Sequence, residues 1–73
     1  MKQLSQKETS QRLGRRIVAL RDKNKLSQTD LCYEAEVDLS TLSRLERGKL
    51  NVTLATLCKI SSVLKVNVKD LFE

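Results

Sequence analysis

The chain of 73 residues contains no histidine, no tryptophan and no proline, and it has only two cysteines and two aromatic residues. Without histidine, a His-dependent catalyst and a His-ligated zinc site are excluded. Two cysteines are too few for a four-cysteine zinc site or a scaffold of several disulfides. No apolar run approaches the ~18 residues of a membrane-spanning helix, and the polar start is unlike a signal peptide. We therefore expect one small cytoplasmic domain with reduced thiols, no cofactor and no membrane association.

The same absences argue against an enzyme. No base is available to activate Cys32 or Cys58, and no pair of carboxylates forms a recognisable site. Two interpretations of the cysteines stay open, a redox switch between them and a pair of reduced thiols that behave as small apolar side chains.

The net charge of +5 is distributed unevenly. Residues 1–25 carry eight basic side chains against two acidic ones, a net charge of +6, whereas residues 26–52 have a net charge of −2 and residues 53–73 of +1. A basic surface favours nucleic acid or an anionic membrane as a partner, although many small domains with this charge bind neither.

The pattern of apolar residues is helical throughout, with no strand, linker or repeat. Leu13, Ile17 and Leu20 repeat at the spacing of a helix face, and Ser5 with Glu8 forms a possible capping box. Capping residues and Gly48 mark the other helix ends. The five predicted helices are Gln6 to about Asn24, Gln28 to Ala35, Leu39 to about Arg47, Leu54 to Leu64, and Val68 to Phe72.

The second and third of these helices are joined by only about three residues. A connection this short forces a steep crossing instead of an antiparallel hairpin, which is the geometry of a helix-turn-helix motif. In such a motif the second helix can project into the major groove of DNA.

Three segments together resemble the phage repressor and Cro family. They are Leu26-Ser27-Gln28-Thr29-Asp30-Leu31, Leu42-Ser43-Arg44-Leu45-Glu46-Arg47-Gly48-Lys49, and the aliphatic stretch from Thr56 to Val66. The resemblance implies an all-α, compact five-helix lambda-repressor-like domain at residues 12–73, with the motif at about residues 28–47. Residues 1–11 would form an N-terminal extension that can include the first turns of the first helix.

The function that this resemblance implies is sequence-specific DNA binding by a transcription regulator, a repressor or controller that acts as a homodimer on a palindromic operator. The alternative is an antitoxin or protein-interaction module that keeps the fold with weak or no DNA binding, and the net negative charge of residues 26–52 favours it. The expected partners are double-stranded DNA, a second copy of the chain, and a toxin or other protein.

The positions that the resemblance assigns to base contacts are Leu39, Ser40, Thr41 and Arg44. An arginine can bind guanine O6 and N7 together, but Arg44 could equally be a surface arginine or contact phosphate only. The short hydroxyls of Ser40 and Thr41 suit bases, phosphate or a helix start. Leu39 replaces a polar residue, and it either packs at the edge of the core or contacts a thymine methyl.

Phosphate contacts are implied for Ser27, Gln28, Ser43, Lys49 and Asn51. Gln28 would bind phosphate at a helix N-terminus, or be an exposed polar residue of the first turn. Ser27 caps the helix in either case. Lys49 and Asn51 would contact the DNA backbone or lie in a solvated loop. Lys2 and Lys7 would form an arm that reaches a minor groove, or belong to a frayed terminus.

The resemblance also implies structural roles. Arg21 near the end of the first helix would pair with Glu46, unless Glu46 is an exposed surface acid. Glu36 and Lys65 stand where glycine is common, which costs roughly 1 kcal/mol if the backbone is left-handed. The candidate dimer interface comprises Val63, Val68, Leu71 and Phe72, some of which could instead complete the core.

Overall fold

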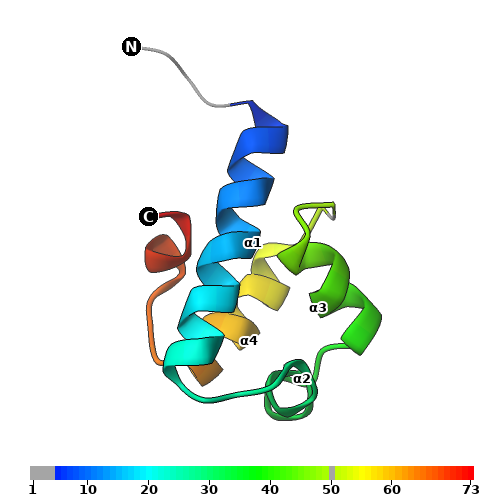
Figure 1. Ribbon diagram of the computed structural model, residues 1–73, viewed down its shortest axis with the longest axis vertical. Helices are drawn as coiled ribbons and strands as arrows, with labels where there is room; N and C mark the ends of the chain where they lie inside the picture. Colours follow the sequence, from blue (N-terminus) through cyan, green and yellow to red (C-terminus); the bar gives the residue numbers. More distant parts are fainter. Residues whose placement is uncertain (1–4, 50) are drawn as a thin grey trace.

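The computed structural model describes residues 5–49 and 51–73. These residues form four α-helices and a terminal 3₁₀ helix, without a strand (Figure 1). Their bounds are α1 (Gln6–Lys23), α2 (Gln28–Ala35), α3 (Leu39–Glu46), α4 (Leu54–Leu64) and η1 (Val68–Phe72). The expected fifth α-helix is therefore wrong in type, because the last five helical residues adopt the tighter 3₁₀ geometry common in short terminal segments.

The helices begin where the capping residues are. The Ser5 hydroxyl accepts the backbone N–H of Glu8, whose carboxylate accepts the N–H of Ser5, so the capping box that the sequence predicts is present. Thr53 caps α4 in the same way, by accepting the N–H of Thr56. Asp38 precedes α3 as expected, but its side chain makes no capping hydrogen bond.

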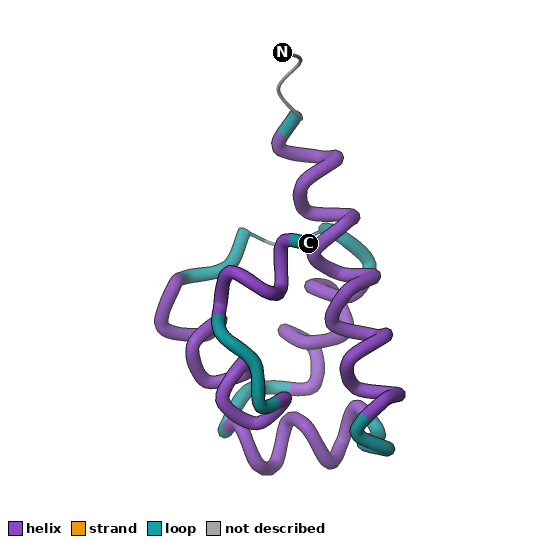
Figure 2. The backbone as a smooth tube through the Cα atoms, turned by 90° about the vertical axis from the view of Figure 1, so that its left-hand side faces the viewer, coloured by secondary structure: helices purple, strands orange, loops and turns teal. Residues whose placement is uncertain are grey.

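The helices enclose one apolar core. Ile17 of α1, Leu31 of α2, Leu42 of α3 and Ile60 of α4 are all fully buried. Figure 2 shows the shorter helices gathered along one side of α1, with the first turns of α1 projecting beyond them. Among the described residues, each helix is too short or too polar to cross a membrane.

The apolar residues near the C-terminus divide between core and surface. Leu71 is fully buried, so it belongs to the core of this chain and offers a partner no surface, which corrects its expected place in a dimer interface. Val63 and Val68 pack against the core and are half-buried. Phe72 is the exposed member, with 44% of its surface accessible.

Among residues 5–49 and 51–73, three residues other than glycine have left-handed backbone. Glu36, the turn residue between α2 and α3, has φ 57° and ψ 49°, and Lys65 after α4 has φ 63°. Lys25 adopts the same conformation between α1 and α2, at a position that no sequence signal marked. Each such residue costs about 1 kcal/mol, so the chain accepts local strain to make its short connections.

Gly14 sets the distance between α1 and α3. A Cβ atom at this position would lie 2.5 Å from the backbone oxygen of Glu46 and 2.7 Å from that of Leu45. Both are main-chain atoms, which cannot move aside as a flexible side chain can. The absence of a side chain at Gly14 therefore lets α1 lie directly against the end of α3.

We predict that Gly14→Ala destabilises the domain. Helix propensity alone would make the substitution stabilising by about 1 kcal/mol. The clash with backbone atoms reverses this sign and costs about 1–3 kcal/mol, as is usual for overpacked positions. Urea denaturation measures the effect, with Ala19→Gly on the exposed side of α1 as the control for propensity. A more stable Gly14→Ala variant would contradict the packing shown here.

Candidate nucleic-acid interface

Helix α3 presents one face to the core and another to solvent. Leu42 and Leu45 are buried, and a helix turns by about 100° per residue. Ser40 and Arg44 are therefore exposed on the opposite arc, Leu39 is exposed at its edge, and Thr41 and Ser43 are half-buried. Leu39 is 50% exposed, so about half of its surface is available for an outside partner, which agrees with a place at the edge of the core as well as with a contact to DNA.

Arg44 is exposed and forms no salt bridge within residues 5–49 and 51–73. Arg47, immediately after α3, is exposed on the same arc and donates to the backbone oxygen of Ser43 at 3.4 Å. Arg47 was not among the positions that the resemblance assigned to DNA contacts. Its spacing of three from Arg44 and four from Ser43 is the signal that could have found it.

Glu46, at the end of α3, is the centre of a hydrogen-bonded cluster. Its two carboxylate oxygens accept hydrogen bonds from Nε and Nη2 of Arg21, at 2.9 and 3.2 Å, so the ion pair is bidentate. The Nε2 amide of Gln28 donates to the same carboxylate at 2.8 Å, and Nη1 of Arg21 donates to the backbone oxygen of Leu26 at 3.0 Å. The cluster therefore connects α1, the start of α2 and the end of α3.

Both charges in this cluster are largely withdrawn from solvent. The side chain of Arg21 is 14% exposed and that of Glu46 only 6%. The hydrogen bonds to Glu46 raise the pKa of Arg21 above its ordinary value, despite the opposing effect of burial. Glu46 is thus not the exposed surface acid that was the alternative interpretation of the sequence.

The cluster also holds Gln28. This residue is half-buried at the first position of α2, and one of its two amide hydrogens is used by Glu46. The second hydrogen remains for the phosphate contact that the resemblance implies. Since the amide is already oriented by the chain, such a contact would need little further ordering of the side chain.

Ser27 and Asp30 form a second capping box at the start of α2. The Ser27 hydroxyl accepts the N–H of Asp30, and the Asp30 carboxylate accepts the N–H of Ser27, both at 3.0 Å. The backbone hydrogen bond from Ser27 lowers the pKa of Asp30 below its ordinary value. The hydroxyl hydrogen of Ser27 is not used by the cap, so it is free to donate to a phosphate.

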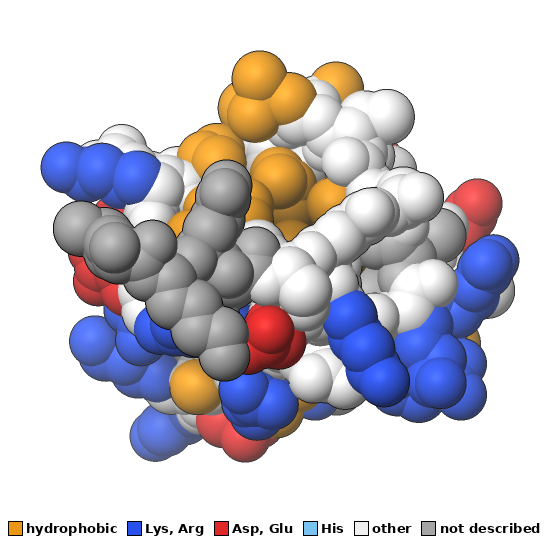
Figure 3. Space-filling view, turned by 90° about the horizontal axis from the view of Figure 1, so that it is seen from above, with side chains coloured by type: hydrophobic (Ala, Val, Ile, Leu, Met, Phe, Trp, Pro, Cys, Tyr) orange, Lys and Arg blue, Asp and Glu red, His pale blue; other side chains and the backbone are white. Residues whose placement is uncertain are grey.

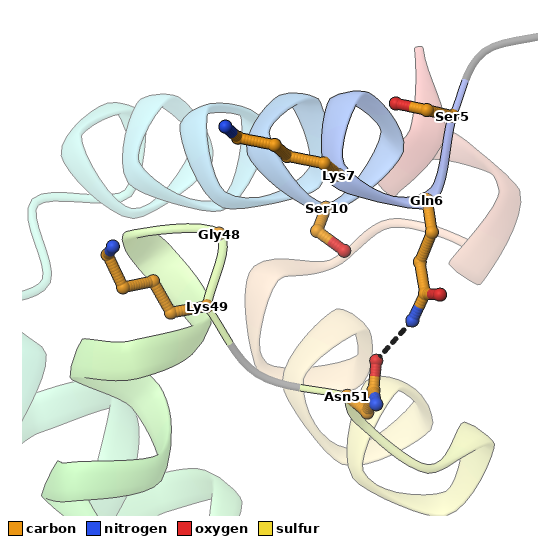
Figure 4. A pocket seen from close by; sticks show the side chains of 7 residues that line it. All are labelled: Ser5, Gln6, Lys7, Ser10, Gly48, Lys49 and Asn51. Atoms are coloured by element: carbon orange, nitrogen blue, oxygen red, sulfur yellow. Dashed lines mark hydrogen bonds between the residues drawn. The ribbon is translucent and has the colours of Figure 1, made fainter.

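The loop after α3 lies beside the start of α1. Lys49 and Asn51 are exposed, and the Asn51 side-chain oxygen accepts a 2.6 Å hydrogen bond from the Gln6 amide (Figure 4). Lys7 belongs to the first turn of α1, so it is part neither of a flexible arm nor of a frayed terminus. Lys2, the other residue expected there, lies outside the described residues.

The remaining predicted residues are not part of this face. Cys32 is buried between the helices, where burial raises the pKa of its thiol, and Cys58 is exposed on α4. Both thiols are free.

In the view from above, Lys and Arg side chains cluster on the side where α3 lies, although others are scattered elsewhere (Figure 3).

Two short helices that cross steeply, the second with a solvated polar face, define a helix-turn-helix DNA-binding domain. A family model described as helix-turn-helix matches residues 17–71, and the chain belongs to this family of DNA-binding transcription regulators.

Similar proteins include two controllers and a repressor. The control protein C.MunI of Mycoplasma sp is 37% identical over 62 residues, which cover 84% of each chain. The control protein C.BamHI of Bacillus amyloliquefaciens is 36% identical over 82% of this chain and 75% of its own. The immunity repressor of Bacillus phage phi105 is 36% identical over 77% of this chain, but the match covers only 39% of that protein.

The fold also matches solved structures. The restriction-modification controller protein C.AhdI from Aeromonas hydrophila superposes with a TM-score of 0.83 and 32% sequence identity, and the match covers 86% of this chain and 96% of that one. The clp gene regulator ClgR from Corynebacterium glutamicum gives a TM-score of 0.81 at 25% identity, covering 86% of this chain and 67% of ClgR.

We predict that breaking the Arg21–Glu46 pair unfolds much of the domain. Either Arg21→Met or Glu46→Met leaves the other charge buried without its partner, which costs about 3–5 kcal/mol. The double variant Arg21→Met/Glu46→Met buries no unpaired charge and should lose far less than the sum of the single variants. Urea denaturation of all four proteins measures the coupling, and additive losses would show that the pair is not coupled.

Proposed function

We propose that the chain is a controller of restriction–modification genes that binds an inverted-repeat operator as a homodimer. The observation that carries this proposal is the outward arc of α3, on which Leu39, Ser40, Ser43 and Arg44 are available while the helix itself is held by buried groups. The similarity to C.MunI, C.BamHI and C.AhdI supports the choice of a controller over other regulators.

In this proposal α3 enters the major groove and reads the bases. The Arg44 guanidinium reads guanine, and Ser40 and Thr41 contact bases from the first turn of the helix. Leu39 packs against a thymine methyl, which its 50% exposure permits. Arg47 joins the phosphate-contacting residues, because it extends the same arc beyond the end of α3.

Phosphates on the two sides of the groove would be bound by two groups of residues. Ser27 and Gln28 lie at the start of α2, where free backbone N–H groups favour an anion. Ser43, Lys49 and Asn51 lie on α3 and in the loop that follows it. These contacts fix the position of α3 in the groove without reading sequence.

The acidic residues of the motif lie at different places relative to this proposed interface. Asp30 and Glu34 lie four residues apart on the outer arc of α2, which faces away from the buried Leu31 and Ala35. Gln28 lies on the arc that meets Glu46 instead. Glu46 is withdrawn into the cluster with Arg21, but the Asp30 carboxylate accepts the N–H of Ser27 and therefore lies beside a proposed phosphate contact. The net negative charge of residues 26–52 is thus only partly outside the proposed interface, and it still favours the alternative of a module that binds only proteins.

The second copy of the chain would pack near the C-terminal segment. Phe72 is exposed and Val63 and Val68 are half-buried, so these three residues offer apolar surface that a partner can cover. The two recognition helices would then lie about 34 Å apart, one turn of DNA, because the symmetry of the dimer must match the repeat of the groove.

Selection from random duplex DNA tests the proposal. We expect an inverted repeat with half-sites one helical turn apart to be enriched, and the complex to contain two copies of the chain. Binding weakens steeply as salt increases if phosphates contribute as proposed. No binding at low salt would overturn the proposal, and enrichment of a single half-site bound by one copy would overturn the homodimer.

Two substitutions separate base reading from phosphate binding. Arg44→Ala should relax the preference at one base position of each half-site and cost about 1–3 kcal/mol per lost base contact. Lys49→Gln should weaken binding to all sequences similarly and flatten the dependence of affinity on salt. Repeating the selection and the salt titration with each variant measures both effects; identical behaviour of the two variants would contradict these roles.

A further inference from the structure

A hollow of about 480 Å³ lies between the first turns of α1 and the loop after α3 (Figure 4). It is built from two segments that are about 40 residues apart in sequence. Its lining residues are Ser5, Gln6, Lys7, Ser10, Gly48, Lys49 and Asn51.

The lining of this hollow suits an anion. It includes two ammonium groups, Lys7 from α1 and Lys49 from the loop, and no carboxylate. Ser10 adds a hydroxyl, and Gly48 adds backbone without a side chain. Glu8, the nearest acid in sequence, is not among the lining residues, and its carboxylate accepts the N–H of Ser5.

The two backbone segments that carry the lysines contact each other. The hydrogen bond between Gln6 and Asn51 connects the first turn of α1 to the loop, and it lies at one side of the hollow. In Figure 4, Lys7 extends along the outside of α1 and Lys49 extends from the loop near α3, and both point away from the hydrogen bond between Gln6 and Asn51. Gly48 packs so closely on α1 that an added Cβ would lie 2.9 Å from the Cα of Gln11.

The hollow continues the face that α3 would present to DNA. Lys49 follows Arg47 by two residues at the same end of α3, and both are exposed. Phosphates of one DNA strand follow one another every ~3.4 Å along the helix axis. A phosphate next to those that pass Arg47 is therefore the one expected at the hollow lined by Lys49 and Lys7.

We propose that this hollow binds a backbone phosphate that flanks the DNA segment read by α3, with Lys7 and Lys49 as the paired cations. The site rests on the proposed function, but it adds to the motif a second element, the first turns of α1. It lengthens the DNA footprint of each half-site on its outer side and contributes affinity without base preference.

The test substitutes Lys7 and compares salt dependence. Lys7→Gln should lower the slope of log affinity against log salt by about 0.9 for each lost phosphate contact, or about 1.8 for a homodimer. The wild type would then lose roughly tenfold more affinity than the variant between 50 and 200 mM salt. Lys7→Arg should keep the wild-type slope. Lys23→Gln, at the opposite end of α1, removes the same charge outside the hollow and should also leave the slope unchanged.

The Lys7→Gln variant should remain folded, so a change in its salt dependence reports on DNA binding and not on stability. Lys7 lies in the first turn of α1, where a positive charge is unfavourable, so replacing it by glutamine should leave thermal stability unchanged or slightly raised. Phosphate ethylation on the inverted repeat enriched from random DNA, or on a 30-base-pair duplex of arbitrary sequence if no repeat is enriched, identifies the contact. One flanking phosphate should interfere with wild-type binding and not with Lys7→Gln.

The outcomes separate the site from the function on which it rests. If the wild type binds neither duplex at low salt, the proposed function fails, and this site fails with it. If the wild type binds but Lys7→Gln keeps its slope and its ethylation pattern, the hollow is not a phosphate site and DNA binding by α3 stands. An equal loss of slope in Lys23→Gln would also overturn the site, because the effect would then be one of net charge.

Discussion

The domain depends most on the buried carboxylate of Glu46. Two nitrogens of Arg21 and the amide of Gln28 donate to it, so one acidic group connects three helices. The Glu46 side chain is only 6% exposed, so its negative charge is tolerated only while its hydrogen-bond partners stay in place. Loss of one partner therefore destabilises the whole cluster. The orientation of α3, and with it the direction in which Arg44 points, follows from this cluster as much as from apolar packing.

Helix α1 lies outside the helix-turn-helix motif, but it supplies several of the contacts that hold the motif in place. It contributes Arg21 to the cluster, Gly14 to the close backbone approach, and Ile17 to the core. The 2.5 Å that would separate a Cβ of Gly14 from the Glu46 oxygen shows how near the two helices lie. The basic charge concentrated in residues 1–25 therefore has two uses, since Arg21 is structural while Lys7 lies exposed beside the loop after α3.

Local features were predictable because each depends on a few neighbouring residues. The bounds of α2 and α4 follow from Ser27, Thr53 and the apolar spacing, and the left-handed residue Glu36 lies where the resemblance expects glycine. The fifth helix was wrong in type, because five residues show too little of a period to separate 3₁₀ from α geometry. Gly14, Lys25 and Arg47 were missed because their importance depends on neighbours or angles that no local pattern contains.

The sequence by itself determined the helical class, the ends of the helices and the candidate interface residues. It could do so because capping and apolar periodicity depend on residues only three or four positions apart. Only the tertiary structure decided which of these residues share a surface. It buried Leu71, left half of Leu39 exposed, used one amide hydrogen of Gln28 within the chain and placed Lys7 and Lys49 around one hollow. These outcomes depend on how α1 packs against α3 and the loop after it, which requires contacts between residues 25 to 45 positions apart.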